Sequence, residues 1–582
     1  MAIKWTPAQQ QVINSDRDKI LVSASSGSGK TTVMIERIVN LITNHKVSID
    51  NILVTTFTNA AAQDMKSKLI QRLTDALQNS SDKNFLLEQL QIAETAQICT
   101  LHSFCSDLIR KYYYVAGVDS AFTVIQDLEA SLKKSKAIKK VFQEYLELGD
   151  QVFLKLYDIF SKKRKTDNLA KYINQIYTFY RTLPKSQNWL HINIDKDAID
   201  EYINEYKKLA DDYYKSQLKS IIDHAQAIGY DPAVKAAECV LDGIKTRSFP
   251  SRLPSQSSSD EHDTLTVQFI ERSKSICKNA KKFYVDFYDK ISQPTSEEKL
   301  VNKLLEVVGK FAQKYDELKK EDFELDFADL EHYAFDVLNN AEVYDEIKQK
   351  YQYLFVDEYQ DINPMQEAII NLFEDSKLFF VGDVKQSIYR FRLCDPDIFI
   401  DKYHNFKSGT NPNNIAIDLN DNFRSVKSIL DFNNELFSRL MTQSLGGVDY
   451  DKDARFVANV DDLQSAYPAV NIVIGQVTKE PKTEPDKVYS VKNHINQSDI
   501  TNAKAEADII INEISKLLQD GRVLKDNLIQ PPDYSDIVIL LRSLKNSSFE
   551  IIKEISKVYP VISNLETELL SRPEILMLID YI

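Results

Sequence analysis

Doubly wound parallel sheets with a large helical insertion are the α/β fold that this sequence predicts. Two short apolar runs, at 20–22 and 353–356, each lead directly into a polar loop, as buried parallel strands do. Strand patterns alternate with helical patterns from residue 1 to about 117 and again from about 326 to 400. The stretch from about 118 to 325 is charged and helical throughout, so we expect it to be an insertion into the first sheet domain.

The first element is a strand followed by a phosphate-binding loop and the start of a helix. After Ile20–Val22 come small residues, whose backbone N–H groups can turn inward around phosphate oxygens. Lys30 supplies a positive charge to the β- and γ-phosphates, the Thr31 hydroxyl suits magnesium, and the helix dipole favours the anion. Ala24 stands where the simple pattern has its first glycine. A Gly- and Ser-rich turn is the alternative, but Gly-Lys-Thr at this junction predicts a nucleotide site. The residues expected around the nucleotide here are Ala24, Ser25, Ser26, Gly27, Ser28, Gly29, Lys30, Thr31 and Thr32.

An apolar strand ending in two carboxylates predicts the second half of the site. Strand Tyr353–Val356 would place Asp357 and Glu358 at the carboxyl edge of a parallel sheet, where ligands of open α/β folds bind. Asp357 would hold magnesium, directly or through water, and Glu358 would orient and deprotonate the attacking water. Alone, the pair fits a solvated acidic turn equally well. With the phosphate loop upstream, it predicts a P-loop NTPase of RecA-like type that uses ATP and Mg²⁺.

Seven motifs in a fixed order identify a family. They are Trp5–Gln9, Ala24–Thr31, Val54–Ala62, Thr100–Cys105, Asp357–Asp361, Val381–Arg392 and Leu419–Ser425. On these residues the chain resembles superfamily 1 DNA helicases of the UvrD/PcrA/Rep type. It is most similar to the N-terminal part of AddA, the helicase–nuclease subunit of the bacterial end-processing complex, and to the related RecB. That closer similarity rests on Asp326–His332, on Val384–Gln386, and on Phe391, where UvrD-type enzymes usually have Trp.

The resemblance implies further nucleotide residues. Gln9 corresponds to the glutamine that reads adenine, Phe423 to the ring that stacks on adenine, and Arg424 to the arginine that reaches the γ-phosphate. Gln386 follows a strand and would sense loss of the γ-phosphate. Arg37, two turns into the first helix, would help to hold the nucleotide, although a solvated helix face suits it nearly as well. On spacing alone, Phe423 fits core packing and Arg424 fits a surface ion pair.

Resemblance also implies a set of DNA contacts. Rings that stack on bases, interleaved with cations that follow phosphates, are typical of single-strand binding. A half-buried strand end with solvated arginines is the alternative. The expected DNA residues are Phe57, His102, Tyr389, Arg390, Phe391 and Arg392.

Composition sets the wider limits. The 582 residues exceed a single core, and 43% hydrophobic with 27% charged residues is ordinary for a globular chain. The net charge of −14 does not itself indicate a nucleic-acid binder, although a bound strand feels its local channel rather than the average. Basic clusters at 162–165 and 278–282 fit solvated helix faces better than duplex contacts. Five cysteines without ligand-like spacing, and no apolar run of membrane length, favour the cytoplasm.

We expect residues 1–117 and 326–400 to form ATPase domain 1A and residues 118–325 to form the helical insertion 1B. Residues 401–582 would form a partial second RecA-like domain, 2A. In that domain, Asp536–Ser543 is the expected buried strand. Loops are expected at about 248–259 and 479–499.

The family would continue with an insertion called 2B, later motifs and, in AddA proteins, a nuclease domain. None of these follows, so we interpret the chain as an N-terminal fragment with severely reduced ATP turnover.

Three functions remain open after the sequence analysis. The first is that of an ATP-dependent 3′→5′ DNA helicase subunit, which acts on duplex ends in double-strand-end processing and recombinational repair, with single-stranded DNA in its motor channel. It would form a heterodimer with an AddB-like or RexB-like subunit. The second is a stand-alone UvrD-like helicase without nuclease. The third is a non-catalytic module that binds nucleotide and single strands.

Overall fold

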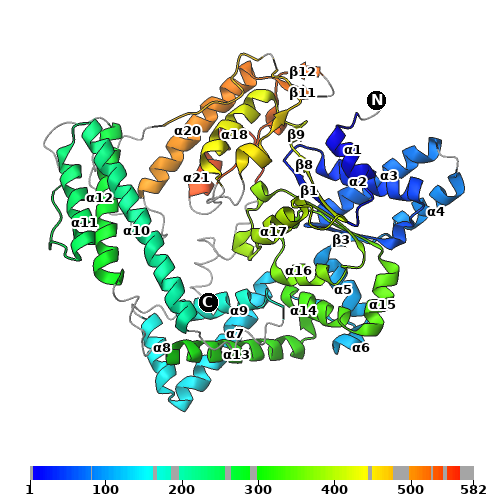
Figure 1. Ribbon diagram of the computed structural model, residues 1–582, viewed down its shortest axis with the longest axis horizontal. Coiled ribbons are helices and arrows are strands. Elements are labelled where there is room, and N and C mark those ends of the chain that lie inside the picture. Colours follow the sequence, from blue (N-terminus) through cyan, green and yellow to red (C-terminus); the bar gives the residue numbers. More distant parts are fainter. Residues whose placement is uncertain are drawn as a thin grey trace. The chain divides into compact units, whose positions relative to one another are not determined.

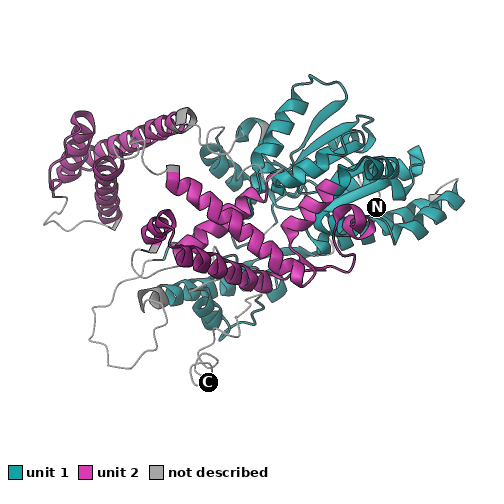
Figure 2. Ribbon diagram, turned by 90° about the horizontal axis from the view of Figure 1, so that it is seen from below, with its two compact units in different colours: residues 1–107, 337–582 teal, residues 108–336 magenta. Residues whose placement is uncertain are grey.

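The computed structural model (Figure 1) describes residues 4–79, 82–161, 167–184, 196–255, 264–288, 298–442, 449–463, 465–475, 497–525, 528–541 and 547–563. The chain forms two compact units, residues 1–107 with 337–582 and residues 108–336 (Figure 2). Each unit is built around hydrophobic clusters of its own residues.

A six-stranded sheet is the centre of the first unit, and all its neighbouring strands run parallel. In the register of the sheet, Leu21 lies between Phe380 and Ala416. The strands, in spatial order, are β3 (Ile98–Thr100), β2 (Ile52–Thr56), β6 (Tyr353–Val356), β7 (Lys377–Gly382), β1 (Lys19–Ala24) and β8 (Asn414–Leu419).

The strands are apolar on both sides because helices cover both faces of the sheet. Alternate residues such as Ile20, Phe355 and Phe379 join the core formed with the first four helices. On the opposite face, Phe380 packs against Tyr359, with ring centroids 4.4 Å apart. The continuous apolar runs that predicted buried strands are therefore confirmed, and so is the α/β fold class.

Helices complete the first unit. Eight of them belong to the sheet domain: α1 (Pro7–Asn14), α2 (Lys30–His45), α3 (Asn59–Asn79), α4 (Lys83–Ala93), α5 (Leu101–Lys111), α15 (Ala341–Lys350), α16 (Pro364–Asn371) and α17 (Pro396–Lys407). Helix α5 continues past residue 107 into the second unit. The later part of the unit contains α18 (Lys427–Leu440), α20 (Gln497–Asp520) and α21 (Ser547–Ile555).

The first sheet extends beyond the boundary at residue 400 that the sequence suggested. Strand β8 pairs with β1 along its whole length, from Lys19↔Asn414 to Ala24↔Leu419. Helix α17 packs against both of these strands. Because β1 needs a hydrogen-bonding partner on each side, the chain returns to its free edge before leaving the sheet domain.

The expected buried strand at Asp536–Ser543 is not a strand in the structure. Residues 537–541 have no strand conformation, and Val538 and Leu540 are 76% and 89% exposed. After Leu419, the strands of the described residues are only two or three residues long: β9 (Asp421–Asn422), β10 (Val457–Ala458), β11 (Val523–Lys525) and β12 (Leu528–Gln530). An apolar run forms a buried strand only where neighbours accept its backbone bonds, and the described residues supply none here. Arg542 and Ser543 lie outside them.

The second unit is helical. Helices α7 (Asp127–Leu148), α8 (Gln151–Ser161), α9 (Asp167–Tyr180) and α13 (Glu298–Glu321) share one core, and α10 (Lys196–Ala227), α11 (Asp231–Thr246) and α12 (Thr264–Phe283) share another. A short helix, α6 (Tyr113–Ala116), precedes them, and α14 (Phe327–Leu338) follows them and ends beyond the limit of the unit. The helical insertion predicted for residues 118–325 is therefore present.

The limits of this unit, 108 and 336, lie ten or so residues outside the expected ones. Its two ends are joined by a parallel ladder of β4 (Thr123–Val124) and β5 (Glu324–Leu325). The expected limits fall close to this ladder, where the sequence pattern changes. None of the described helices is long and apolar enough to cross a membrane. The basic cluster 162–165, residues 256–259 and most of the loop 479–499 lie outside the described residues.

A buried ion-pair cluster joins three helices of the second unit. Lys319 of α13 pairs with Asp329 and, at 3.4 Å, with Asp326, while Arg181, just after α9, donates to Asp329 at 2.8 Å. Asp326 and Asp329 each accept the other's backbone N–H at 2.9 Å. His332 bonds the Arg181 carbonyl at 2.9 Å. The Asp326–His332 segment, which the sequence marked as a family feature, therefore fixes the start of α14.

Candidate functional site

Every strand of the sheet ends at the same edge, and each predicted motif lies in the loop after one strand. The loops after β7, β1 and β8 are neighbours and carry nucleotide motifs. The loop after β6 carries the two acids, and those after β2 and β3 carry predicted DNA residues. In spatial order, the edge presents His102, Phe57, Asp357 with Glu358, Gln386, the phosphate loop, and Arg424.

The phosphate loop has the backbone that its glycines predict. Gly27 and Gly29 have φ of 75° and 82°, in the left-handed region that favours glycine. A Cβ on Gly27 would lie only 2.7 Å from Asn422 Nδ2, so this close approach also requires glycine. The Ser28 hydroxyl is buried without a hydrogen-bond partner. A loop that turns polar groups inward without partners suits a bound anion.

Lys30, at the start of α2, forms an ion pair with Glu358. Its ammonium lies 3.2 and 3.3 Å from the two carboxylate oxygens. Glu358 has φ of 51°, a left-handed conformation that costs free energy for a residue with a side chain. The Asp357 carboxylate accepts the Glu358 N–H at 3.0 Å. The strained backbone therefore brings the expected base directly to the phosphate-binding lysine.

The acids at this edge outnumber the buried cations. Lys30 and Lys385 face Asp357, Glu358, Asp361 and Asp383, an excess of two carboxyl groups. Burial, reinforced by the neighbouring Glu358, raises the pKa of Asp357 and that of Asp361 to about 6 each. One oxygen of Asp361 is buried without a partner. A divalent cation would balance this excess.

The residues present fit magnesium in particular. Asp357 is a buried carboxylate at the strand end, and Thr31 is half-buried at the second position of α2. Within the described ranges, no group of three or more His, Cys, Asp or Glu residues could hold a metal ion by itself. Mg²⁺ commonly takes one or two protein ligands and completes its shell with phosphate oxygens and water. This sparse set is therefore the kind that the ion requires.

A chain of buried polar contacts joins Glu358 to Gln386. Gln360, only 1% exposed, donates to Glu358 at 2.8 Å and to Asp361 at 3.1 Å, and its carbonyl oxygen accepts the Asp383 N–H at 2.9 Å. The Asp383 carboxylate in turn accepts from Gln386 Nε2 at 2.7 Å. The sequence analysis assigned no role to Gln360 or Asp383. Polar side chains predicted at the end of a buried strand could have indicated them.

The segment after β8 closes over the phosphate loop. Asn422, 3% exposed, donates to the Ser26 carbonyl at 2.7 Å and accepts the Arg424 N–H at 2.9 Å. The Phe423 N–H donates to the Gly27 carbonyl at 2.9 Å. Arg424 Nη1 lies 3.4 Å from the Ser26 hydroxyl. Phe423 and Arg424 therefore stand beside the loop, with Asn422 as the residue that positions them, which the sequence analysis did not identify.

Gln9 lies against the phosphate loop. It is 5% exposed, donates to the Ser28 carbonyl at 3.0 Å and accepts the Thr6 N–H at 3.0 Å. Its side chain thus caps α1 and braces the loop. The predicted adenine contact would use the same amide group.

Arg37 has a different place from the one that the sequence suggested. Its guanidinium is 83% buried and donates to the carbonyls of Val12, Ile13 and Ser15 at 2.8, 3.2 and 2.9 Å. Burial lowers its pKa to about 10. Because its donors are used by the carbonyl end of α1, we correct its assignment from nucleotide contact to a residue that holds α1 on α2.

Three of the expected DNA residues form one aromatic cluster. The rings of Phe57 and Tyr389 lie 4.8 Å apart, and those of Tyr389 and Phe391 lie 5.8 Å apart. The Arg392 guanidinium lies 5.3 Å from the Tyr389 ring. Phe391 is 76% exposed and Arg390 is also exposed. The cluster therefore offers an open ring and cations to a ligand, as single-strand binding requires. His102 is half-buried at the start of α5.

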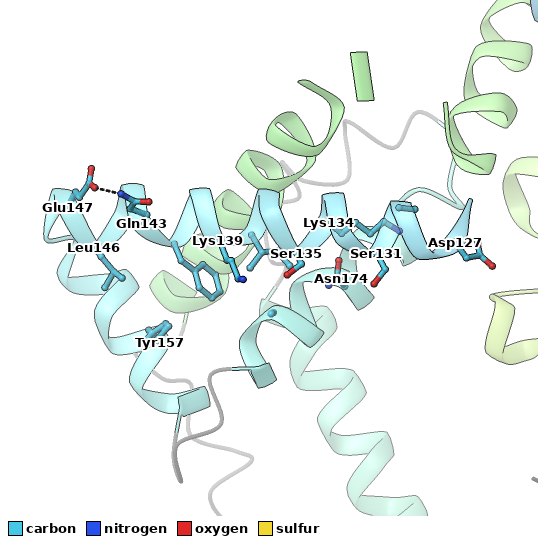
Figure 3. Close-up of a pocket in the computed structure, with 14 residues that line it drawn as sticks. Asp127, Ser131, Lys134, Ser135, Lys139, Gln143, Leu146, Glu147, Tyr157 and Asn174 are labelled. Atoms are coloured by element: carbon cyan, nitrogen blue, oxygen red, sulfur yellow. Dashed lines mark hydrogen bonds between the residues drawn. The ribbon is translucent and has the colours of Figure 1, made fainter. Parts of the chain in front are cut away.

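The largest hollow among the described residues is in the second unit and has no part in these motifs. It is an open groove of about 910 Å³ lined by α7, α8 and α9 (Figure 3). Its polar lining includes Lys134, Lys139, Gln143 and Asn174. No acidic pair or phosphate loop lines it, so it does not compete with the sheet edge as a candidate active site.

Comparison with known proteins agrees with the site. Residues 5–407 match the UvrD/REP helicase N-terminal domain family. The chain is 30% identical to the AddA subunit of the ATP-dependent helicase/nuclease from Natranaerobius thermophilus, over 98% of its length and 49% of that protein. It is 31% identical to the protein of that name from Alkaliphilus oremlandii, over 93% and 48%. It is 30% identical to that from Carboxydothermus hydrogenoformans, over 99% and 52%. The chain thus spans about half the length of the curated relatives it matches.

Proposed function

The chain belongs to the UvrD/REP helicase family, and from this premise we propose that it is an ATP-dependent 3′→5′ DNA motor. Its substrates would be ATP and DNA, with a single strand in the motor channel and duplex ends as the point of entry. The supporting observation is that Gln386, beside the phosphate loop, and the cluster of Phe57, Tyr389 and Phe391 share one sheet edge within a few residues of each other.

The proposed hydrolysis uses residues of this edge. Phosphate-loop N–H groups and Lys30 hold the β- and γ-phosphates, and Glu358 accepts a proton from water as its oxygen attacks the γ-phosphorus. The bond from that phosphorus to the ADP oxygen breaks, and Arg424 stabilises the charge that develops. Asp357 and Thr31 would hold Mg²⁺, which neutralises phosphate charge. Gln386 would detect the γ-phosphate.

Base recognition and strand binding complete the proposal. Gln9 would read adenine, and Phe423, 43% exposed, would stack on it. Phe391 and Tyr389 would stack on DNA bases, while His102, Arg390 and Arg392 contact the strand beside them. Loss of the γ-phosphate would move Gln386 and, through the five residues that follow, change the grip on the strand.

The names of the relatives, which describe a subunit of a helicase/nuclease, suggest the cellular role. We propose double-strand-end processing and recombinational repair in the cytoplasm, in a heterodimer with an AddB-like or RexB-like subunit. The word "subunit" in the relatives' name and the five free cysteines of the chain support this assignment.

A second candidate is a module that binds nucleotide and single strands without turnover. It is favoured by the exposed 537–541 segment, because ATP sites of superfamily 1 lie between two sheet domains. A stand-alone helicase without nuclease is the third candidate, and Asp326–His332 and Val384–Gln386 speak against it.

The test is ATP hydrolysis and nucleotide binding with and without single-stranded DNA, beside a Lys30→Ala control. DNA-stimulated hydrolysis that Lys30→Ala abolishes is the expected result. Binding of both ligands without hydrolysis would favour the second candidate. Failure to bind nucleotide would overturn the proposal.

A further inference from the structure

Lys385 is a second buried lysine at the sheet edge, and neither the hydrolysis described above nor its DNA contacts use it. Its side chain is only 9% exposed. It lies in the short 3₁₀ turn Val384–Gln386 that follows β7, next to the phosphate loop that follows β1. A lysine is rarely buried unless it is paired, so its contacts indicate what it does there.

The Lys385 ammonium bridges two elements of the nucleotide site. It lies 2.8 Å from Asp383 Oδ1 and donates to the Ser25 hydroxyl at 3.0 Å. Ser25 is the first residue after β1, and its N–H donates to the Leu419 carbonyl of β8 at 3.0 Å. The ring of Phe456, 5.7 Å away, lies over the ammonium. The cation therefore links the start of the phosphate loop to the end of β7.

The carboxylate that holds Lys385 also holds Gln386. Asp383 is 1% exposed, and its second oxygen accepts from Gln386 Nε2 at 2.7 Å. The neighbouring residues Lys385 and Gln386 thus occupy the two oxygens of one buried carboxylate. Removing the ammonium would leave that carboxylate buried with less compensation, and its position would no longer be fixed relative to Ser25.

We propose that Lys385 is a positioning residue that fixes Gln386 and the first turn of the phosphate loop for recognition of the γ-phosphate. The proposal rests on the proposed function, since it assigns the γ-phosphate of ATP to this edge. Lys385 acts through Asp383 and Ser25 rather than by contacting the reacting atoms. Its loss is therefore felt by nucleotides with a γ-phosphate and hardly by ADP.

Lys402 supplies a matched control. It is a lysine of α17 with a side chain 17% exposed, and it pairs with one carboxylate, Glu367, at 2.8 Å. It packs over the rings of Tyr359 and Phe380, away from the phosphate loop. A structural ion pair and a positioning ion pair are thus available in the same unit for the same substitution.

The experiment measures the dissociation constants of fluorescent ADP and of a non-hydrolysable ATP analogue. Lys385→Met should weaken binding of the ATP analogue about tenfold, the loss expected for one hydrogen bond to a charged group, and change ADP binding by less than about twofold. Lys385→Arg, which keeps the charge and the donors, should recover most of the loss. Lys402→Met should change neither constant.

Equal weakening for both nucleotides, or a profile like that of Lys402→Met, would overturn the proposal. If Lys385→Met does not fold, Lys385→Gln keeps a donor toward Ser25 and is compared in the same way. Lys30→Ala separates the two levels of the argument. If wild type binds nucleotide and Lys30→Ala does not, an unselective Lys385 variant contradicts only this inference, whereas a wild type that binds neither nucleotide contradicts the proposed function as well.

Discussion

Two clusters of buried charge, one in each unit, use the same residue types for different ends. At the sheet edge, Lys30 and Lys385 face four carboxyl groups, and polar atoms of Ser28 and Asp361 are buried without partners. In the helical unit, Arg181 and Lys319 face Asp326 and Asp329, two cations for two acids. Buried charge is common to both clusters.

The difference lies in what remains unsatisfied. Both oxygens of Asp329 accept from cations, and Asp326 and Asp329 also satisfy each other's backbone N–H groups. At the sheet edge, an excess of two acids and the left-handed backbone of Glu358 persist. A balanced cluster stabilises the fold, whereas an unbalanced and strained one is suited to receive a charged ligand.

The largest effect should come from Glu358→Gln at the unbalanced cluster. Loss of the base should lower ATP turnover by about 10²–10⁴-fold, while nucleotide binding is kept because Lys30 is released from its ion pair. The free energy of unfolding should stay within about 1 kcal/mol of wild type or rise, since one crowded acid is removed. Steady-state turnover, nucleotide titration and urea unfolding measure the three effects. A variant that turns over ATP normally would remove Glu358 from the mechanism.

The balanced cluster should respond in stability instead. Lys319→Met removes a 2%-exposed cation and leaves two buried acids facing Arg181 alone, which should lower the free energy of unfolding by about 3–5 kcal/mol. Lys320→Met, at a 64%-exposed lysine paired with Asp316, should cost at most about 1 kcal/mol. Urea unfolding of both variants tests this difference, and equal costs would contradict the contrast between the clusters.

A smaller effect is expected for the exposed ring beside the sheet edge. Phe391→Ala should weaken binding of a short single-stranded DNA by about 1–3 kcal/mol, the usual value of one stacked base. Phe432, 38% exposed on α18, is the control, and Phe432→Ala should leave the affinity unchanged. Fluorescence anisotropy of a labelled oligonucleotide measures both. If the two variants bind alike, the aromatic cluster is not the DNA contact.

The smallest effect concerns pH, and here the two clusters should respond in opposite directions. Burial, with Arg181 nearby, lowers the pKa of His332 to about 4, so the stability from its neutral form is complete above about 6.5 and is lost as pH falls toward 4. The raised pKa values of Asp357 and Asp361 have the reverse effect, because their protonation favours the folded state as pH falls below 6. His332→Gln should therefore reduce the acid-induced loss of stability by about 1–2 kcal/mol. Unfolding midpoints at pH 7 and pH 4.5 test this, and an unchanged loss would exclude His332 as its source.

The sequence predicted the parts of this molecule that depend on local chemistry. The phosphate loop, the strands before it and before Asp357, and the helical insertion are present where the residues placed them. Phe57 and Tyr389 could be paired only through the resemblance, because 332 positions of chain separate them and only the strand order brings them together. The bracing residues Gln360, Asp383, Lys385 and Asn422 were not predicted. Their importance comes from hydrogen bonds between loops of different strands, which no local pattern encodes.

Two errors share one physical cause. Arg37 was assigned from its distance along a helix, but the carbonyl end of α1 captures its guanidinium. The run at 537–541 was assigned from its apolar residues, but a strand also needs neighbours. In both cases the partner, not the residue itself, decides the outcome.

The strand order of the first sheet has a consequence for synthesis on the ribosome. Strands β1 and β2 emerge early, yet in the finished sheet they are separated by β6 and β7, which lie some 300 residues later in the chain. Until Lys377–Gly382 has been made, the apolar edges of β1 and β2 have no native neighbour, and unpaired edges of this kind favour aggregation. The helical insertion emerges during that interval with its own cores, and its β4–β5 ladder draws the two ends of the interval together. Nascent-chain protection by chaperones should therefore last until β7 has left the ribosome.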